Sequence, residues 1–183
     1  MVEQMTANWH HSRITIVTGD IASLQVDAVV NAANSRLAGG SGVDGAIHRA
    51  AGYDQLQVAC REIGGCPTGE VRVTPGFNLA AKYIFHAVGP VWQGGHDDEE
   101  RLLSSCYSNS LALAQQYGVK AIAFPAISCG VYGYPPEKAV PCALATVLDC
   151  LPRSPTVKSV IFCCFSDDMA QRYQQVLASL IQH

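Results

Sequence analysis

The residues most able to do chemistry lie in a glycine-rich segment in the first third of the chain. Residues 31–52 read N-A-A-N-S-R-L-A-G-G-S-G-V-D-G-A-I-H-R-A-A-G and follow an apolar run at residues 27–30. The run predicts a buried strand, and the small residues at the end of the segment predict a helix. A glycine loop between a strand and a helix leaves backbone N–H groups free to bind an anion, usually a phosphate.

Polar side chains accompany this loop and suggest what the site does. The carboxamides of Asn31 and Asn34 suit sugar hydroxyls, and the carboxylate of Asp44 suits a water molecule or a ribose hydroxyl. His48 follows four residues after Asp44, so the two would share one face of a helix. Taken singly, such an Asp more often caps a helix, and such Asn residues cap turns. Together with the glycines they predict a nucleotide-sugar site with chemistry beside the phosphates.

A second glycine loop, residues 127–135, follows a predicted strand. Its N–H groups could close on a diphosphate from the opposite side, or its glycines could simply permit positive φ angles in a connection. Cys129 in this loop raises the alternative of a thiol nucleophile, but no neighbouring His or helix start is placed to lower its pKa. The pairing of two glycine loops favours the phosphate interpretation.

Two further residues have both a functional and an ordinary interpretation. Asp20 either caps the short segment at residues 21–24 or accepts a hydrogen bond from an exocyclic amine, such as that of adenine. Phe165 ends the last predicted strand and is either a core residue or a flat wall for a base.

The glycines at residues 40–45 also match the dinucleotide-binding pattern G-x-G-x-x-G, and we reject that interpretation. In a dehydrogenase the turn follows its strand at once, whereas here seven or more residues intervene. No acidic residue follows a second strand where the ribose ligand would be expected.

Composition narrows the class of protein. The 183 residues are 49% hydrophobic and 15% charged, which predicts one globular domain rather than a disordered chain. The formal net charge is −3 and no basic cluster exists, so nucleic-acid binding through phosphate neutralisation is disfavoured. No apolar run is long enough for a membrane span and no secretory signal is present, so we expect a cytoplasmic protein. We expect residues 1–12 to be a flexible extension and residues 13–183 to be the domain.

The chain has eight cysteines, none of them in a C-x-x-C pair or at zinc-ligand spacing. We therefore expect buried, reduced thiols and no metal site.

Strand and helix patterns alternate along the chain, which predicts a three-layer α/β/α domain with a largely parallel sheet. Because Pro141 clashes inside a helix, the fourth helix is expected to start late or kink. The polar and glycine-rich segments follow predicted strands, so they should meet at the carboxyl edge of the sheet. The predicted strands are residues 13–17, 27–32, 70–74, 83–88, 120–125 and 159–165, and the helices are residues 45–51, 55–63, 99–117, 137–151 and 167–181.

Several of these segments together resemble the macrodomain signature, in its order and spacing. They are residues 19–21, 26–34, 39–52, 86–92, 124–128 and 130–135. The resemblance covers roughly residues 13–182, and it is nearest to the MacroD-type branch, which includes the bacterial O-acetyl-ADP-ribose deacetylases. Ser41 departs from the family pattern, which usually has a further glycine there, and Cys129 stands where Thr is common.

The resemblance implies an α/β/α sandwich with a six-stranded mixed sheet and an ADP-ribose cleft at the strand ends. By position, Asp20 and Ile21 would recognise adenine beside Phe165, and Asn34 would hold the distal ribose. Asp44 would be the catalytic carboxylate, and His48 would support it. The residues that would wrap the diphosphate and the distal ribose are Gly40, Ser41, Gly42, Val43, Ser128, Cys129, Gly130, Val131 and Tyr132.

The activity that follows is hydrolysis of an ester on the distal ribose. The substrate would be O-acetyl-ADP-ribose, or ADP-ribose linked to Asp or Glu of a protein. Asp44 would position the water, which attacks either the acyl carbonyl or the ribose carbon. No cofactor is required. One alternative is a reader module that binds ADP-ribose without turnover. Another is a protein or RNA regulator that uses the cleft for an adenosine-containing partner.

Overall fold

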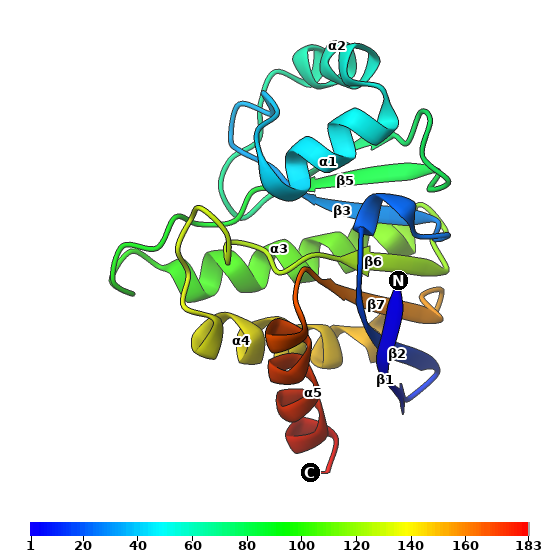
Figure 1. The fold of residues 1–183 in the computed structure, drawn as a ribbon, viewed down its shortest axis with the longest axis vertical. Coiled ribbons are helices and arrows are strands. Elements are labelled where there is room, and N and C mark those ends of the chain that lie inside the picture. The colour runs from blue at the N-terminus through cyan, green and yellow to red at the C-terminus, as the bar shows by residue number, and fades with distance from the viewer. Residues whose placement is uncertain (183) are drawn as a thin grey trace.

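The computed structural model describes residues 1–182, which form a mixed sheet between two layers of helices (Figure 1). The sheet has seven strands in the order β1-β2-β7-β6-β3-β5-β4. Its five inner strands are parallel, and the two edge strands, β1 and β4, run antiparallel to their neighbours. The strands are β1 (Val2–Trp9), β2 (Ser12–Thr18), β3 (Ala28–Ala32), β4 (Val71–Pro75), β5 (Tyr83–Ala87), β6 (Ala121–Phe124) and β7 (Ser159–Cys164).

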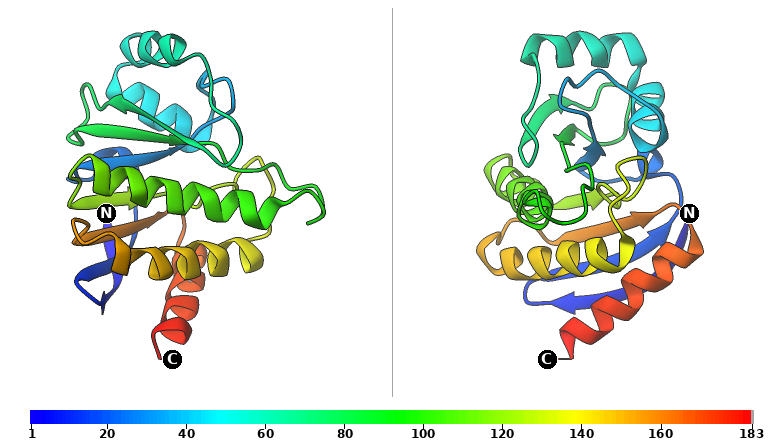
Figure 2. Two further views of the ribbon diagram at one scale, coloured as in Figure 1. Left: turned by 180° about the vertical axis from the view of Figure 1, so that it is seen from behind. Right: turned by 90° about the vertical axis from the view of Figure 1, so that its left-hand side faces the viewer.

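The helices divide between the two faces of the sheet, as the two views in Figure 2 show. Alternate residues of the inner strands enter different cores, because successive side chains of a strand point to opposite faces. Val30 belongs to the core that contains residues of α3, α4 and α5, whereas Val29 belongs to the core that contains residues of α1 and α2. The predicted α/β/α layering is therefore confirmed. The helices are α1 (Gly42–Ala51), α2 (Tyr53–Ile63), α3 (Glu99–Gln116), α4 (Pro136–Cys150) and α5 (Asp167–Ile181), with short 3₁₀ turns η1 (Ile21–Ser23) and η2 (Leu151–Arg153).

The amino-terminal residues differ from the prediction. Instead of a flexible extension over residues 1–12, Val2–Trp9 form β1 and raise the number of strands from the expected six to seven. Pairing with β1 satisfies the backbone groups that β2 would otherwise expose at the sheet edge. Trp9 packs against the core, and its indole N–H donates to the carbonyl of Leu148 at 2.9 Å.

Helix boundaries also differ from the prediction by up to three residues, and the first and fourth helices matter most here. The first helix begins at Gly42 rather than at residue 45, so Asp44 lies in its first turn. The fourth helix does not start late: it begins at Pro136, and Pro141 lies inside it. Pro136 suits the first helical position, where a backbone N–H has no partner in any case. Of the described helices, none combines the length and the apolar composition that a membrane crossing needs.

The parallel strands bring distant loops together. The carboxyl ends of β2, β3, β5, β6 and β7 meet at one edge, and the loops at residues 19–20, 33–41, 88–98, 125–135 and 165–166 leave from it. This edge is where open α/β sheets collect their ligands.

We expect Trp9→Ala to lower the free energy of unfolding by about 2–4 kcal/mol, because the variant loses a large half-buried side chain and its hydrogen bond. Urea unfolding followed by circular dichroism measures the change. Asn8→Ala, at an exposed position of the same strand, is the control and should change stability by less than about 0.5 kcal/mol. Equal stability of the two variants would mean that β1 contributes little to the fold.

Candidate functional site

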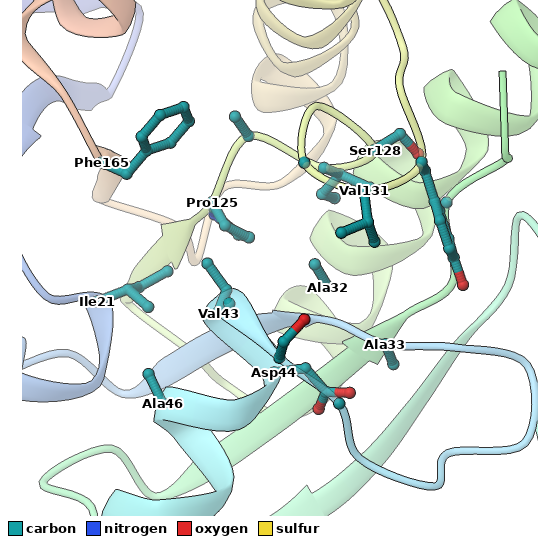
Figure 3. Close-up of a pocket in the computed structure, with 18 of the residues that line it drawn as sticks. Ile21, Ala32, Ala33, Val43, Asp44, Ala46, Pro125, Ser128, Val131 and Phe165 are labelled. Carbon is teal, nitrogen blue, oxygen red and sulfur yellow. The ribbon is translucent and has the colours of Figure 1, made fainter.

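A cleft of about 660 Å³ opens at the carboxyl edge of the sheet. Such a volume suits a ligand of nucleotide size. Figure 3 shows Ile21 and Phe165 on one side of the cleft, Asp44 on the other, and Ser128 and Val131 on the β6 side. The sequence-predicted residues that line it are Asp20, Ile21, Asn34, Gly40, Ser41, Gly42, Val43, Asp44, Ser128, Gly130, Val131, Tyr132 and Phe165.

The end formed by Asp20, Ile21 and Phe165 suits a flat, apolar group. Phe165 is 71% exposed at the end of β7, so it is not a core residue. Asp20 does cap η1, because its Oδ1 accepts a hydrogen bond from the N–H of Ala22 at 3.0 Å. Asp20 also lines the cleft, so the cap and a ligand contact are compatible at this residue.

The first glycine loop delivers the amino end of α1 to the cleft. Ser41 is the N-cap residue, but its side chain makes no capping hydrogen bond, so the first-turn N–H groups stay open. A Cβ at Gly45 would lie 2.6 Å from the carbonyl oxygen of Gly40, and only glycine permits this close approach. The positive end of the helix dipole then adds to the open N–H groups, which together favour an anion.

The second glycine loop faces the first across the cleft. The N–H groups of Gly130, Val131 and Tyr132 have no hydrogen-bond acceptor within residues 1–182. Ser128 adopts a positive φ of 69°, and its buried hydroxyl has no partner in the same described range. A Cβ at Gly89 would collide with this hydroxyl, so the loops after β5 and β6 need glycine to pack together.

The cleft lacks cationic side chains. None of its lining residues in the described part of the chain is Lys or Arg. An anionic ligand would therefore be held by backbone N–H groups and the end of α1, as the net charge of −3 already suggested. In the described range, no three His, Cys, Asp or Glu side chains are grouped to hold a metal ion.

The carboxylate of Asp44 has one oxygen held by the protein and one left open. Its Oδ1 accepts a hydrogen bond from Nδ2 of Asn31 at 2.8 Å. Nδ1 of His48 lies 3.0 Å from the same oxygen and donates to the backbone carbonyl of Asp44, also at 3.0 Å. No hydrogen-bond donor within residues 1–182 reaches Oδ2, which lies on the side of Gly40 and the cleft. The side chain is 7% exposed. This geometry suits a base whose free oxygen faces a ligand or a water.

Asn31, His48 and Cys129 do not line the cleft, unlike the other predicted residues. Asn31 is fully buried and His48 is 1% exposed, so both lie behind Asp44. The predicted direct ligand contact by Asn31 is corrected for this reason: its Nδ2 donates to the carboxylate from beneath, and the residue exposes no surface to the cleft. Asn34 does line the cleft, and it also braces the loop, donating to the carbonyl of Gly39 and accepting from the N–H of Ala38.

Two neighbours of His48 favour different protonation states of its ring: Asp44 favours the charged ring and Gln57 favours the neutral one. Burial alone lowers its pKa, but the carboxylate of Asp44, the thiol of Cys60 and the backbone oxygen of Asp44 together raise the pKa to about 10. Nε2 lies 2.7 Å from Nε2 of Gln57, an amide donor that favours the neutral ring. The role toward Asp44 does not depend on which form prevails. In both forms Nδ1 faces two acceptors on Asp44, so it carries a hydrogen and donates.

Three residues that sequence patterns did not predict support the carboxylate from behind: His86, Thr74 and Gln57. His86 in β5 is the register partner of Asn31 in β3, and its Nδ1 lies 3.1 Å from Nδ2 of Asn31. A signal for this pair exists in the sequence: each is a polar residue within an otherwise apolar strand. Only the strand pairing shows that the two are neighbours.

Cys129 lies off the cleft, and burial raises the pKa of its thiol to about 11. At pH 7.5 we therefore expect iodoacetamide to alkylate Cys129 roughly a hundredfold more slowly than an unhindered cysteine. The rate should climb about tenfold per pH unit with the thiolate fraction. Peptide mass spectrometry measures the reaction, and Cys129→Ser identifies the modified peptide. Rapid labelling at pH 7.5 would restore the thiol nucleophile as a candidate.

Comparisons with known proteins find the same family by sequence and by structure. The family model described as Macro domain matches residues 30–143. A Macro domain-containing protein of Chlorobaculum tepidum is 54% identical over 166 residues, which are 91% of this chain and 96% of the relative. The O-acetyl-ADP-ribose deacetylase of Escherichia fergusonii is 48% identical over 170 residues, 91% of this chain and 96% of that protein. A solved structure of an Oceanobacillus iheyensis macrodomain mutant with ADPR has a TM-score of 0.93 at 42% identity, covering 98% of this chain and 99% of that one.

Proposed function

Since the chain belongs to the macro domain family, we propose that its cleft binds ADP-ribose and that the protein hydrolyses an ester on the distal ribose. The observation that carries the proposal is the carboxylate of Asp44, with Oδ1 held from behind and Oδ2 open to the cleft. A binding site alone does not need a buried acid with one free oxygen.

The ligand's orientation follows from what lies at each end of the cleft. The adenine would lie against Ile21 and Phe165, with Asp20 within reach of its exocyclic amine. The diphosphate would lie between the end of α1 and the loop at residues 128–132, where open N–H groups face it. The distal ribose would then lie beside Asn34 and Asp44.

Asp44 would act as a general base at this ribose. Oδ2 takes a proton from a water molecule, whose oxygen bonds to the acyl carbon. The bond between that carbon and the ribose oxygen breaks, and the ribose oxygen takes the proton from Asp44. The products are ADP-ribose and the free acid. General-base assistance of this kind is worth about 10²–10⁴-fold in rate.

The preferred substrate class is O-acetyl-ADP-ribose, and the name of the 48% identical relative supports it. ADP-ribose linked to Asp or Glu of a protein contains the same ester bond, so the same machinery would act on it. The alternative is a reader that binds without turnover. The open N–H groups and the apolar base wall would serve that function equally well, so turnover decides between the two.

We expect Asp44→Asn to reduce the rate of acetate release from O-acetyl-ADP-ribose by about 10²–10⁴-fold, since the amide cannot accept the proton of water. Calorimetry should find the dissociation constant for ADP-ribose changed by only a few-fold. Asp54→Asn, at an exposed acid in the first turn of α2, is the matched control. If wild-type protein binds ADP-ribose and releases no acetate, the reader function is correct instead.

Phe165→Ala should weaken ADP-ribose binding by roughly 5–150-fold, the range for removing an aromatic that stacks on a base. Ribose 5-phosphate lacks the base, so its affinity should not change. Phe77→Ala is the control, because Phe77 is also an exposed phenylalanine and lies outside the cleft. Unchanged affinity for ADP-ribose in Phe165→Ala would place the base elsewhere.

A further inference from the structure

A chain of hydrogen bonds crosses three strands and ends on the carboxylate of Asp44. It runs from the carbonyl of Pro75 through Thr74 in β4, His86 in β5 and Asn31 in β3. The strands β3, β5 and β4 are neighbours in the sheet. This series of side-chain hydrogen bonds therefore runs across the strands, in the same direction as the backbone hydrogen bonds of the sheet. Thr74 and His86 do not line the cleft.

The direction of every donor in this chain is determined from its two ends. At one end, the carbonyl of Pro75 can only accept, so the hydroxyl of Thr74, 3.1 Å away, donates to it. The same hydroxyl then accepts from Nε2–H of His86 at 2.9 Å. At the other end, Oδ1 of Asp44 can only accept, so Nδ2 of Asn31 donates to it at 2.8 Å.

The hydrogen positions deduced from the two ends must agree at the ring of His86. Nδ2 of Asn31 carries two hydrogens, and the second one points at Nδ1 of His86, 3.1 Å away. Nδ1 must therefore be unprotonated, and Nε2 must carry the single hydrogen of a neutral ring. Burial agrees with this form, since it lowers the pKa of His86 to about 4. The ring thus accepts on one side and donates on the other.

Burial makes these contacts consequential. Asn31, His86 and Thr74 are 0%, 1% and 2% exposed, so water does not replace a lost partner. Oδ1 of Asn31 is already buried without a partner among the described residues. If the ring did not accept at Nδ1, a hydrogen of Asn31 would lose its partner as well, and the carboxamide could rotate away from Asp44.

We infer that His86 is a positioning residue for the hydrolysis: acting through Asn31, it fixes the rotation of the Asp44 carboxylate so that Oδ2 stays open to the cleft. The inference rests on the proposed function, because a base is useful only if a reaction takes place. Thr74 extends the role, since its hydroxyl keeps the ring hydrogen on Nε2. His86 would therefore affect the hydrolysis of the distal ribose ester without contacting the ester itself.

The test compares two replacements of His86. His86→Asn places an amide oxygen near the position of Nδ1, so it keeps an acceptor for Asn31, whereas His86→Leu fills the space without one. We expect His86→Leu to lower kcat for acetate release about 10–100-fold, as loss of an orienting partner does elsewhere. The dissociation constant for ADP-ribose should stay within about twofold, and His86→Asn should recover most of the rate. Ile84→Ala, a buried truncation in the same strand, controls for loss of stability alone.

A second pair of variants covers the case in which His86→Leu does not fold. Thr74→Val removes the hydroxyl and nearly keeps the shape, whereas Thr74→Ser keeps the hydroxyl. We expect Thr74→Val to lower kcat severalfold and Thr74→Ser to retain most of it. Nitrogen-15 NMR of the wild-type ring should place its hydrogen on Nε2 and find that the preference weakens in Thr74→Val.

The outcomes separate this inference from the proposed function. An active wild type with an equally active His86→Leu overturns the positioning role and leaves the hydrolase intact. Equal losses in His86→Leu and Ile84→Ala, or a ring hydrogen on Nδ1, also overturn it. A wild type that binds ADP-ribose and releases no acetate overturns the proposed function, and the positioning role with it.

Discussion

The two nitrogen atoms that converge on Oδ1 of Asp44, Nδ2 of Asn31 and Nδ1 of His48, determine how the rest of the site is built. One donor, Asn31, belongs to β3, and the other, His48, lies one turn further along α1. Each donor is held in turn from behind: Asn31 by His86 in β5, and His48 by Gln57 in α2. The carboxylate is therefore fixed both by the sheet and by the helices that cover it. Its second oxygen remains the only one free to meet a ligand.

Side chains and backbone N–H groups have different roles in the cleft. Apolar side chains form the wall where a base would lie, and open N–H groups supply the place for an anion. This division explains why Ser41 and Cys129, which depart from the family pattern, do not disturb the architecture. The backbone at residue 41 is what matters there, and Cys129 lies off the cleft. By contrast, Gly45 and Gly89 cannot be replaced by a larger residue. A Cβ at Gly45 would collide with the carbonyl oxygen of Gly40, and one at Gly89 would collide with the side chain of Ser128.

The sequence predicted the parts of the site that are local in the chain. A strand, a glycine loop and a helix placed Asp44, Asn34 and the open N–H groups together, because their spacing along the chain fixes their geometry. It did not predict His86, which lies 55 residues from Asn31 and meets it only through the pairing of β3 with β5. It also missed β1, because the edge that this strand covers is a property of the assembled sheet. Burial of Asn31 and His48 was missed for the same reason.

Strand β1 has a practical consequence for anyone who handles this protein. Since it runs antiparallel to β2, it returns Met1 to the carboxyl end of that strand, where a Cβ at Gly19 would lie 3.2 Å from Cα of Met1. Gly19 lines the cleft, so an affinity tag or a fused partner placed ahead of Met1 would emerge at the end of the cleft formed by Asp20, Ile21 and Phe165. Helix α5 starts at Asp167, near Phe165, and its 15 residues end at Ile181, roughly 20 Å away. A tag attached beyond this helix leaves the entrance unobstructed.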